Sequence, residues 1–408
     1  MVDVVAPSPR TKRDTRLRTL ALISAAHWVS HFHMLVLPML FPFLKTALDI
    51  DYIDLGFVLT VFAVVSALTQ APAGYLVDHF GARKILLIGL CLGGAALGLI
   101  GLHLSYPILV TSAVLLGLAN SVYHPADYAI LDAHMDEARM GRAFSIHTFA
   151  GYLGGAMAPM IVAALMTTLS GSTALIMCGA TGPLVAASLL VFDVPEAGAN
   201  RRKDGSGRAS QRSIITPTLI LLTIFFTLLG LSTSGISNFG VVALMNGFSA
   251  SFSTANVALT AYLAASATGV LAGGFLADRT DRHSHVAVIC FGINAAVLLL
   301  VALVALPPAL LTITMAAAGF LGGMIAPSRD MLVRKAAPEG AAGRAFGIVS
   351  TGFNFSGILS PLLFGWIMDQ SLPRWVFGVS ALFMVLTVVL ALFTERKREP
   401  DHARVGTV

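Results

Sequence analysis

The sequence predicts an all-α membrane protein of twelve transmembrane helices in two pseudo-symmetric six-helix bundles, and three observations carry this prediction. The 408 residues are 56% hydrophobic and only 12% charged, whereas a soluble domain carries about 25% charged residues. The mean hydropathy of +0.82 indicates lipid as the solvent. Apolar runs of about 20 residues, enough to cross a bilayer, recur along the chain, and short motifs return after about 200 residues.

Twelve apolar runs divide the chain into two sets of six. The first set covers 18–46, 53–77, 84–104, 106–132, 141–169 and 173–193, and the second covers 216–246, 253–277, 285–305, 308–333, 343–369 and 373–394. The predicted organisation is a tail at 1–17, an N-terminal bundle at 18–193, a linker at 194–215, a C-terminal bundle at 216–394 and a tail at 395–408. The linker is basic and rich in Gly, which predicts flexibility.

The first apolar run follows a basic segment, as the apolar core of a signal peptide does. It continues for longer than such a core and contains His27, His31, Pro38 and Pro42. We therefore expect an uncleaved first span.

The basic residues predict the orientation in the membrane, because Lys and Arg concentrate in cytoplasmic loops. All but two of the 26 Lys and Arg lie on the side of the termini and the linker, which we name the tail side. The exceptions, Lys45 and Arg374, lie on the other side, which we name the far side. Both termini are thus expected in the cytoplasm of a cell with the protein in its inner membrane. The net charge of +5 needs no nucleic-acid partner to explain it.

The three cysteines lie inside apolar runs. Their number is odd, and they lack the spacing of metal ligands: Cys91, Cys178 and Cys290. They therefore predict no disulfide framework and no metal site. We expect packing residues.

Two motifs repeat between the halves. The charged turn Gly74-Tyr-Leu-Val-Asp78-His-Phe-Gly81-Ala-Arg83-Lys84 returns as Gly274-Phe-Leu-Ala-Asp278-Arg279-Thr-Asp281-Arg282-His283, and the pattern Gly117…Pro125…Gly141-Arg-Ala-Phe144 returns 202 residues later. Internal repeats are typical of secondary transporters. With twelve spans, these residues make the chain resemble the major facilitator superfamily over nearly its whole length. The phrase Val122-Tyr-His124-Pro125-Ala resembles the fosmidomycin-resistance branch of that family.

The resemblance assigns a conformational role to the charged turn on the tail side. It implies that the turn and the acid ending the fourth span hold the two halves together in one state and release them in the other. The residues are Gly74, Asp78, Gly81, Arg83 and Asp132, with Gly274, Asp278 and Arg279 in the second half. The glycines one turn before each Asp would allow close approach of helices. The alternative is a fixed surface ion pair, which contributes ~0–1 kcal/mol.

A polar stripe on the fourth span marks a candidate site. Asn120, His124 and Asp127 lie within about 60° on a helical wheel, and a carboxylate inside lipid normally faces a cavity or a partner. The residue 202 positions after Asp127 is Arg329. The pair could exchange a proton for a bound anion, and the alternative is a permanent ion pair.

Histidines on other spans could contribute to the same site. His27 and His31 are i,i+4 neighbours on the first span, and His titrates near neutral pH, which suits proton handling. Structural hydrogen bonding and a weak metal pair are the alternatives. His147, Asn238 and Asn246 are weaker candidates for lining a cavity, because such residues also bond between helices.

These features predict a secondary transporter that moves a small organic solute by alternating access, without a cofactor or a resident metal. The sequence has no phosphate loop and no nucleophile–base arrangement, so we expect neither an enzyme nor ATP hydrolysis. Proton-coupled efflux of a drug-like compound is the first hypothesis, and proton-linked uptake of an organic anion is the second. A membrane sensor and an integral-membrane enzyme are competing classes. The expected partners are the solute, protons and the lipid bilayer, with the protein as a monomer.

Overall fold

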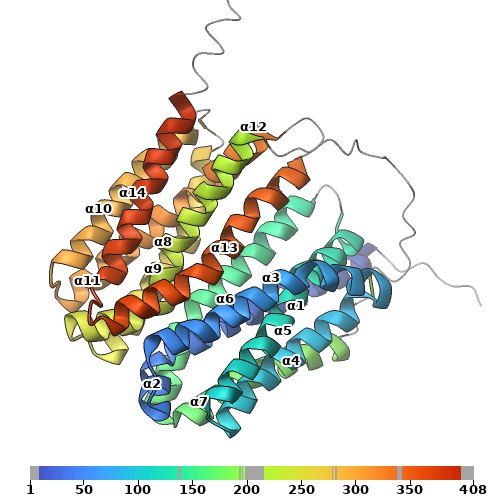
Figure 1. Ribbon diagram of the computed structural model, residues 1–408. Coiled ribbons are helices and arrows are strands. Elements are labelled where there is room, and N and C mark those ends of the chain that lie inside the picture. The colour runs from blue at the N-terminus through green and yellow to red at the C-terminus, as the bar shows by residue number, and fades with distance from the viewer. Residues whose placement is uncertain are drawn as a thin grey trace, which may run out of the picture. The chain divides into compact units, whose positions relative to one another are not determined.

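The computed structural model describes residues 9–136, 139–192, 194, 196–197, 216–277, 279–280, 283–337 and 342–396. Every regular element in these ranges is a helix (Figure 1). The elements are α1 (Pro9–Met39), α2 (Phe41–Leu48), α3 (Tyr52–Phe80), α4 (Ala82–Leu102), α5 (Tyr106–His134), α6 (Met140–Thr168), α7 (Gly171–Val191), α8 (Pro217–Phe248), α9 (Phe252–Ala277), α10 (His283–Leu303), α11 (Pro308–Met324), α12 (Ala326–Ala336), α13 (Ala342–Asp369) and α14 (Trp375–Arg396).

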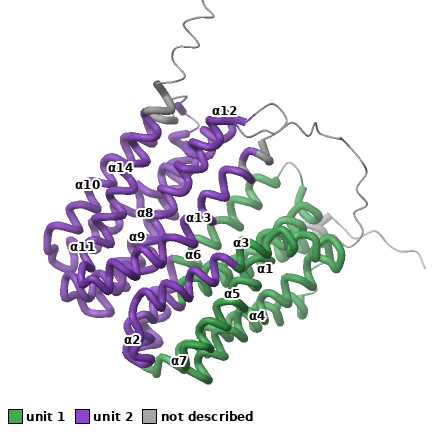
Figure 2. Tube along the Cα trace, in the orientation of Figure 1, with its two compact units in different colours: residues 1–36, 65–155, 168–204 green, residues 37–64, 156–167, 205–408 purple. Residues whose placement is uncertain are grey.

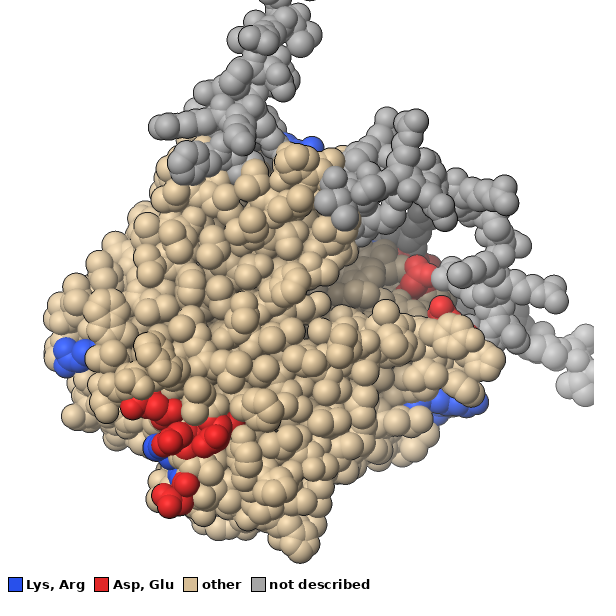
Figure 3. Space-filling view, viewed as in Figure 1, with Lys and Arg blue, Asp and Glu red and all other residues tan. Residues whose placement is uncertain are grey.

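Twelve stretches of these helices are long and apolar enough to cross a membrane, which confirms the predicted all-α fold with twelve candidate spans. The surface agrees with this reading, because one face is almost entirely uncharged and its Lys, Arg, Asp and Glu gather near the rims (Figure 3). Uncharged side chains of this kind suit contact with lipid, where charged side chains are costly.

Two of the predicted runs are interrupted rather than continuous. The run at 18–46 is divided at Leu40, and the run at 308–333 is divided at Ile325. Each new helix has a Pro in its first two positions, Pro42 and Pro327, where the missing N–H does no harm. By contrast, α5 continues through Pro125.

The described helices form two compact units (Figure 2). Unit 1 comprises residues 1–36, 65–155 and 168–204, and unit 2 comprises 37–64, 156–167 and 205–408. The far-side parts of α3 and α6 are thus grouped with the second half of the chain. A buried apolar cluster in unit 1 joins α1, α4 and α5, with Ile23, Leu86 and Ile130 fully buried.

Within unit 2, α9 and α11 approach each other closely at small residues. A Cβ added at Gly319 would lie 1.9 Å from the carbonyl oxygen of Tyr262, and one at Gly323 would lie 2.0 Å from that of Ser266. Glycines on α9 make the reciprocal approach, since a Cβ at Gly273 would lie 2.1 Å from the oxygen of Met324. Small residues allow helices in lipid to pack backbone against backbone.

Replacing Gly319 with Ala is therefore expected to destabilise the protein by about 1–3 kcal/mol, the usual cost of overpacking. The obstacle is a backbone oxygen, so no side-chain rotation relieves it. The measurement is the unfolding midpoint of the purified protein in detergent. Gly292→Ala on α10 is the matched control, because a Cβ there meets nothing within 4 Å. An equal loss of stability in both variants would contradict the packing argument.

Candidate functional site

Four histidines and one aspartate from three helices meet in unit 1. We name them the His–Asp cluster: His27 and His31 from α1, His124 and Asp127 from α5, and His147 from α6. The Asp127 Oδ2 atom lies 3.6 Å from His27 Nδ1 and 3.6 Å from His147 Nε2. Both separations are slightly longer than a hydrogen bond, so a small movement would let the carboxylate bond to either imidazole.

The centre of the cluster is sealed from solvent. Asp127 and His147 are 0% exposed, and His27 is 3% exposed. In the part of the chain that the structure describes, both carboxylate oxygens of Asp127 and both ring nitrogens of His147 lack a hydrogen-bond partner. Buried polar groups are normally bonded, so these atoms are poised for an exchangeable partner.

Two glycines on α6 bring the histidines of α1 into place. A Cβ added at Gly151 would lie 2.5 Å from His27 Cδ2 and 2.9 Å from His31 Cδ2. One at Gly154 would lie 2.1 Å from the carbonyl oxygen of Trp28. The backbone of α6 therefore packs directly on α1, and any larger residue would push the imidazoles away from Asp127.

Aromatic rings connect the sealed centre with a more open face of unit 1. The His27 ring lies 4.7 Å from that of His31 and 5.2 Å from that of His124, measured between centroids. Both outer histidines are half-buried, and Tyr128 beyond them is 42% exposed. Solvent exposure thus increases from the buried carboxylate of Asp127 to the half-buried outer imidazoles, an arrangement that suits the passage of protons.

Three residues of the cluster carry atoms that bind metals in other proteins. His27, Asp127 and His147 each offer one ligand atom, all within 4.8 Å of one another, and three protein ligands can hold Zn²⁺. However, the His27 and His147 rings stack with centroids 4.0 Å apart and 25° between their planes. A metal bound to imidazole lies in the ring plane, and the planes of two stacked rings do not meet within bonding distance of both nitrogens. In these rotamers the donor set does not fit a metal.

The remaining candidates for the site have partners of their own within their units. Asn120 donates to Ser66 Oγ at 2.8 Å, and Asn238 donates to Ser234 Oγ at 3.0 Å. The Asn238 bond lies within α8 rather than between helices, and the role of both residues in the site stays a prediction. Asn120 lies on the same stripe of α5 as Asp127, but its bond goes to α3.

Arg329 lies in unit 2, whereas Asp127 lies in unit 1, and the predicted exchange between them remains a prediction. The Arg329 side chain bonds to Asp330 at 2.8 Å and lies over the rings of Phe226 and Phe353 at 4.8 and 5.3 Å. An arginine held in this way is oriented and only partly exposed.

The charged turn on the tail side has an unexpected anchor in Glu196. Its Oε1 accepts from the backbone N–H of Arg83 at 2.7 Å, and Ala82 N–H donates to the carbonyl oxygen of Ala197 at 2.8 Å. A carboxylate at the start of α4 is stabilised by the helix dipole. Gly81 has a φ of +100° that disfavours any side chain.

The start of the linker is therefore packed, in contrast to the predicted flexibility from 194 onward. Val194 and Ala197 are 1% and 6% exposed and belong to the core of unit 1, because Glu196 fixes the chain between them. Residues 198–215 of the linker lie outside the described residues.

The other candidates for conformational gating are two glycines and a set of charged residues near the tail side. Among the described residues of its own unit, a Cβ at Gly74 or Gly274 meets nothing within 4 Å, and the close helix approach predicted at these glycines stays a prediction. Asp78 and Arg279 are exposed, as is Asp132 at the end of α5. Asp278 lies outside the described residues. The conformational role of this set remains a prediction.

A set of contacts on the far side was missed by the sequence analysis. Asp369, the last residue of α13, accepts from the backbone N–H groups of Tyr52 and Ile53 at 2.9 and 2.8 Å. Asn246 on α8 donates to the hydroxyl of Tyr52 at 3.0 Å, and Thr60 donates to the carbonyl oxygen of Ile358 at 2.9 Å. Within unit 2 these bonds tie the start of α3 to α8 and α13. We name Tyr52, Asn246 and Asp369 the far-side latch.

Comparison with known proteins decides the family. The family model described as Major Facilitator Superfamily matches residues 23–245 and 220–407. The chain belongs to the Major Facilitator Superfamily. The superfamily is a family of membrane transporters and not of enzymes, and the twelve spans agree with a multi-pass member.

One relative within the superfamily is similar over nearly its full length. The fosmidomycin resistance protein of Escherichia coli K12 is 26% identical over 408 residues, covering 97% of each chain. The fold also matches solved superfamily transporters. A bacterial homologue of the human lysosomal transporter Spinster, inward-facing and occupied, gives a TM-score of 0.76 at 15% identity, covering 97% of this chain and 99% of that one. The nucleoside transporter NupG gives 0.75 at 17%, covering 92% and 98%.

Proposed function

We propose that this protein is a secondary transporter that exports a small organic solute in exchange for protons, by alternating access. The observation that carries the proposal is the carboxylate of Asp127, sealed between two imidazoles without a hydrogen-bond partner among the described residues. The tail side faces the cytoplasm, as its basic residues predict, and the protein acts as a monomer in the inner membrane.

The charge of Asp127 makes the cluster a proton site. An ionised carboxylate that is fully buried and has no hydrogen-bond donor is costly, so Asp127 is stable there when a proton is shared with His27 or His147. Its described neighbours are those two imidazoles, the more distant His31 and His124, and Tyr123 and Tyr128 of its own helix, which interact with it electrostatically. No Lys or Arg has a described contact with Asp127, so a proton is the cation that the cluster can accept.

Exchange follows if proton and solute use the cluster in turn. In one state a proton neutralises Asp127. In the other state the bound solute changes the position of α1 or α6, and the proton leaves Asp127 through His31 or His124. The imidazole rings of His31 and His124 are then free to contact the solute. An imidazole can accept a proton on one ring nitrogen and release it from the other, so the transfer needs no further group.

One relative is named a fosmidomycin resistance protein. Because a transporter that protects against a drug moves it out of the cell, this name favours efflux over uptake. The second candidate, proton-linked uptake of an organic anion, has one observation in its favour. Arg329 is held beside two phenyl rings in unit 2 with 16% of its side chain exposed, an arrangement that could bind a carboxylate. Its bond to Asp330 weakens that candidate.

The substrate can be found by ligand-induced stabilisation, since a compound that binds only the folded protein raises its melting temperature. The panel consists of small antibiotics and organic anions and begins with fosmidomycin. The compound that stabilises the protein most is named the probe compound below.

The direction is tested in membrane vesicles with the probe compound. Inverted vesicles with an acidic interior are expected to accumulate it, because protons leaving the vesicle exchange for solute entering. Right-side-out vesicles with an alkaline interior are the opposing arm. Accumulation only in the second arm would replace efflux by proton-linked uptake.

A further inference from the structure

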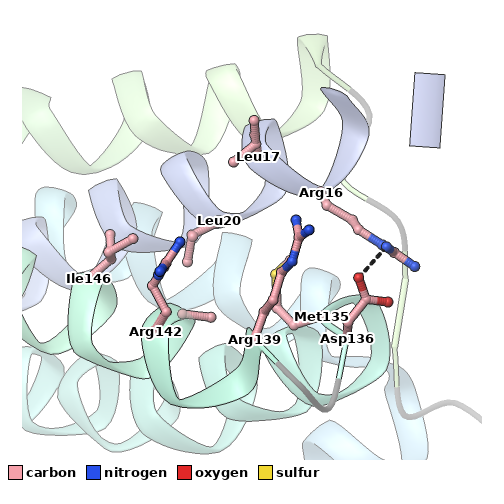
Figure 4. Close-up of a pocket in the computed structure, with 9 residues that line it drawn as sticks. Arg16, Leu17, Leu20, Met135, Asp136, Arg139, Arg142 and Ile146 are labelled. Carbon is pink, nitrogen blue, oxygen red and sulfur yellow. Dashed lines mark hydrogen bonds and ion pairs between the residues drawn. The ribbon is translucent and has the colours of Figure 1, made fainter. Parts of the chain in front are cut away.

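A basic pocket opens on the tail side of unit 1, away from the His–Asp cluster. It lies between the start of α1 and the start of α6 and has a volume of about 380 Å³ (Figure 4). Arg16, Arg139 and Arg142 line it together with a single carboxylate, that of Asp136. The proposed transport mechanism uses none of these side chains.

The charges of the pocket are only partly balanced. Asp136 is paired with Arg16, as the dashed line in Figure 4 shows. The side chains of Arg139 and Arg142 extend from the α6 side toward α1 (Figure 4), and neither has a carboxylate partner among the described residues. Two guanidinium groups that face one pocket form a site for a phosphate group, since arginine binds phosphate through two parallel hydrogen bonds.

Apolar side chains line the same pocket beside the guanidinium groups. Leu17 is 55% exposed and Ile146 is 44% exposed, and Leu20 is almost fully buried beneath them. A free inorganic anion would have no use for this apolar lining. A molecule that joins a phosphate to a hydrocarbon chain would match both parts.

The depth of the pocket fits a lipid headgroup. The candidate spans begin at Asp14 in α1 and at Met140 in α6, so the guanidinium groups lie at the ends of membrane-spanning helices. Basic residues at this depth on the cytoplasmic side attract anionic lipids.

We propose that this pocket binds the phosphate headgroup of an anionic phospholipid from the cytoplasmic leaflet. Arg139 and Arg142 hold the phosphate, and Leu17 and Ile146 contact the first part of an acyl chain. A lipid seated there would link the start of α1 to the start of α6, the two helices that also carry three of the four histidines of the His–Asp cluster.

The test compares melting temperatures of the full-length protein in lipid nanodiscs. One set contains phosphatidylcholine alone, and the other contains one part phosphatidylglycerol in five. The variants are wild type, Arg139→Gln/Arg142→Gln, and Arg18→Gln as the matched control. Arg18 is exposed on the same stretch of α1 and does not line the pocket. Native mass spectrometry counts the phosphatidylglycerol molecules retained by each variant.

The anionic lipid is expected to raise the melting temperature of wild type and Arg18→Gln by several degrees. The melting temperature of the double variant should rise by less than half as much, and this variant should retain one phosphatidylglycerol molecule fewer than wild type. If the double variant does not fold, Arg139→Lys/Arg142→Lys replaces it and should show a reduced shift, because lysine lacks the planar fork. Equal shifts in all variants would overturn the site. Equal stabilisation by inorganic phosphate in detergent would replace the lipid by a free anion.

Discussion

Asp127→Asn is expected to abolish transport of the probe compound driven by a pH gradient, down to the level of vesicles without the protein. The variant should retain exchange of labelled for unlabelled compound. Asn has the shape of Asp but cannot carry the exchangeable proton, so the coupled steps stop while movements with bound solute continue. The measurement is uptake into proteoliposomes, with and without an imposed pH gradient.

The control for this prediction is Asp51→Asn, the same chemical change at a side chain that is 70% exposed. It should transport as wild type does. His147→Gln is expected to lower the pH-driven rate and to leave exchange intact, because it removes one of the two imidazoles beside the carboxylate. Normal pH-driven transport by Asp127→Asn would remove the cluster from the coupling mechanism.

Asp369→Ala is expected to shift the protein toward the state in which the far-side latch is open. Asp369 accepts from two backbone N–H groups at the start of α3, and losing such a cap costs about 0.5–2 kcal/mol. If the cap is made only in the state described here, the ratio of the two states changes by roughly 2- to 30-fold, at 1.4 kcal/mol per factor of ten.

Pulsed electron paramagnetic resonance measures this shift through spin labels at His103 and Leu303. These exposed residues lie at the far-side ends of α4 and α10. The labels are placed in a background without the three native cysteines. Asp369→Ala should enlarge the population with the longer separation. Gln370→Ala, an exposed neighbour, should leave the distances as in wild type. Unchanged distances in Asp369→Ala would show that the latch does not bias the two states.

The fold was predictable because the bilayer limits what a chain can do. Apolar length is read directly from the sequence, and it predicted the twelve spans. The distribution of Lys and Arg predicts the orientation, which stays a prediction. The break at Ile325 was not predicted. The corresponding stretch of the first half, around Pro125, continues as one helix. Gly322 and Gly323 precede Pro327 where Asn120 and Ser121 precede Pro125, and glycine weakens a helix more than these residues do.

The candidate site was predictable within each helix but not between helices. The helical wheel placed His27 with His31 and His124 with Asp127, each pair on one face. That α1, α5 and α6 meet at these faces depends on the close approach at Gly151, which no periodicity reveals. For the same reason His147, a lone histidine on its span, was a weak candidate.

Long-range partners account for what the sequence analysis missed. Asp369 bonds to a backbone 317 residues away in the chain, and Glu196 bonds to Arg83 across 113 residues. Asn246 is a candidate for lining a cavity, and its bond to Tyr52, 194 residues away, was not predicted. Local patterns hold no information about such pairs.

Proton release on solute binding tests the central claim most directly. The purified protein is placed in weakly buffered detergent with a pH indicator, and the probe compound is added to saturation. We expect wild type to release about one proton per bound molecule, because the solute displaces the proton that Asp127 shares with its histidines. Asp127→Asn should bind the compound and release none. Equal release from both proteins would contradict the account.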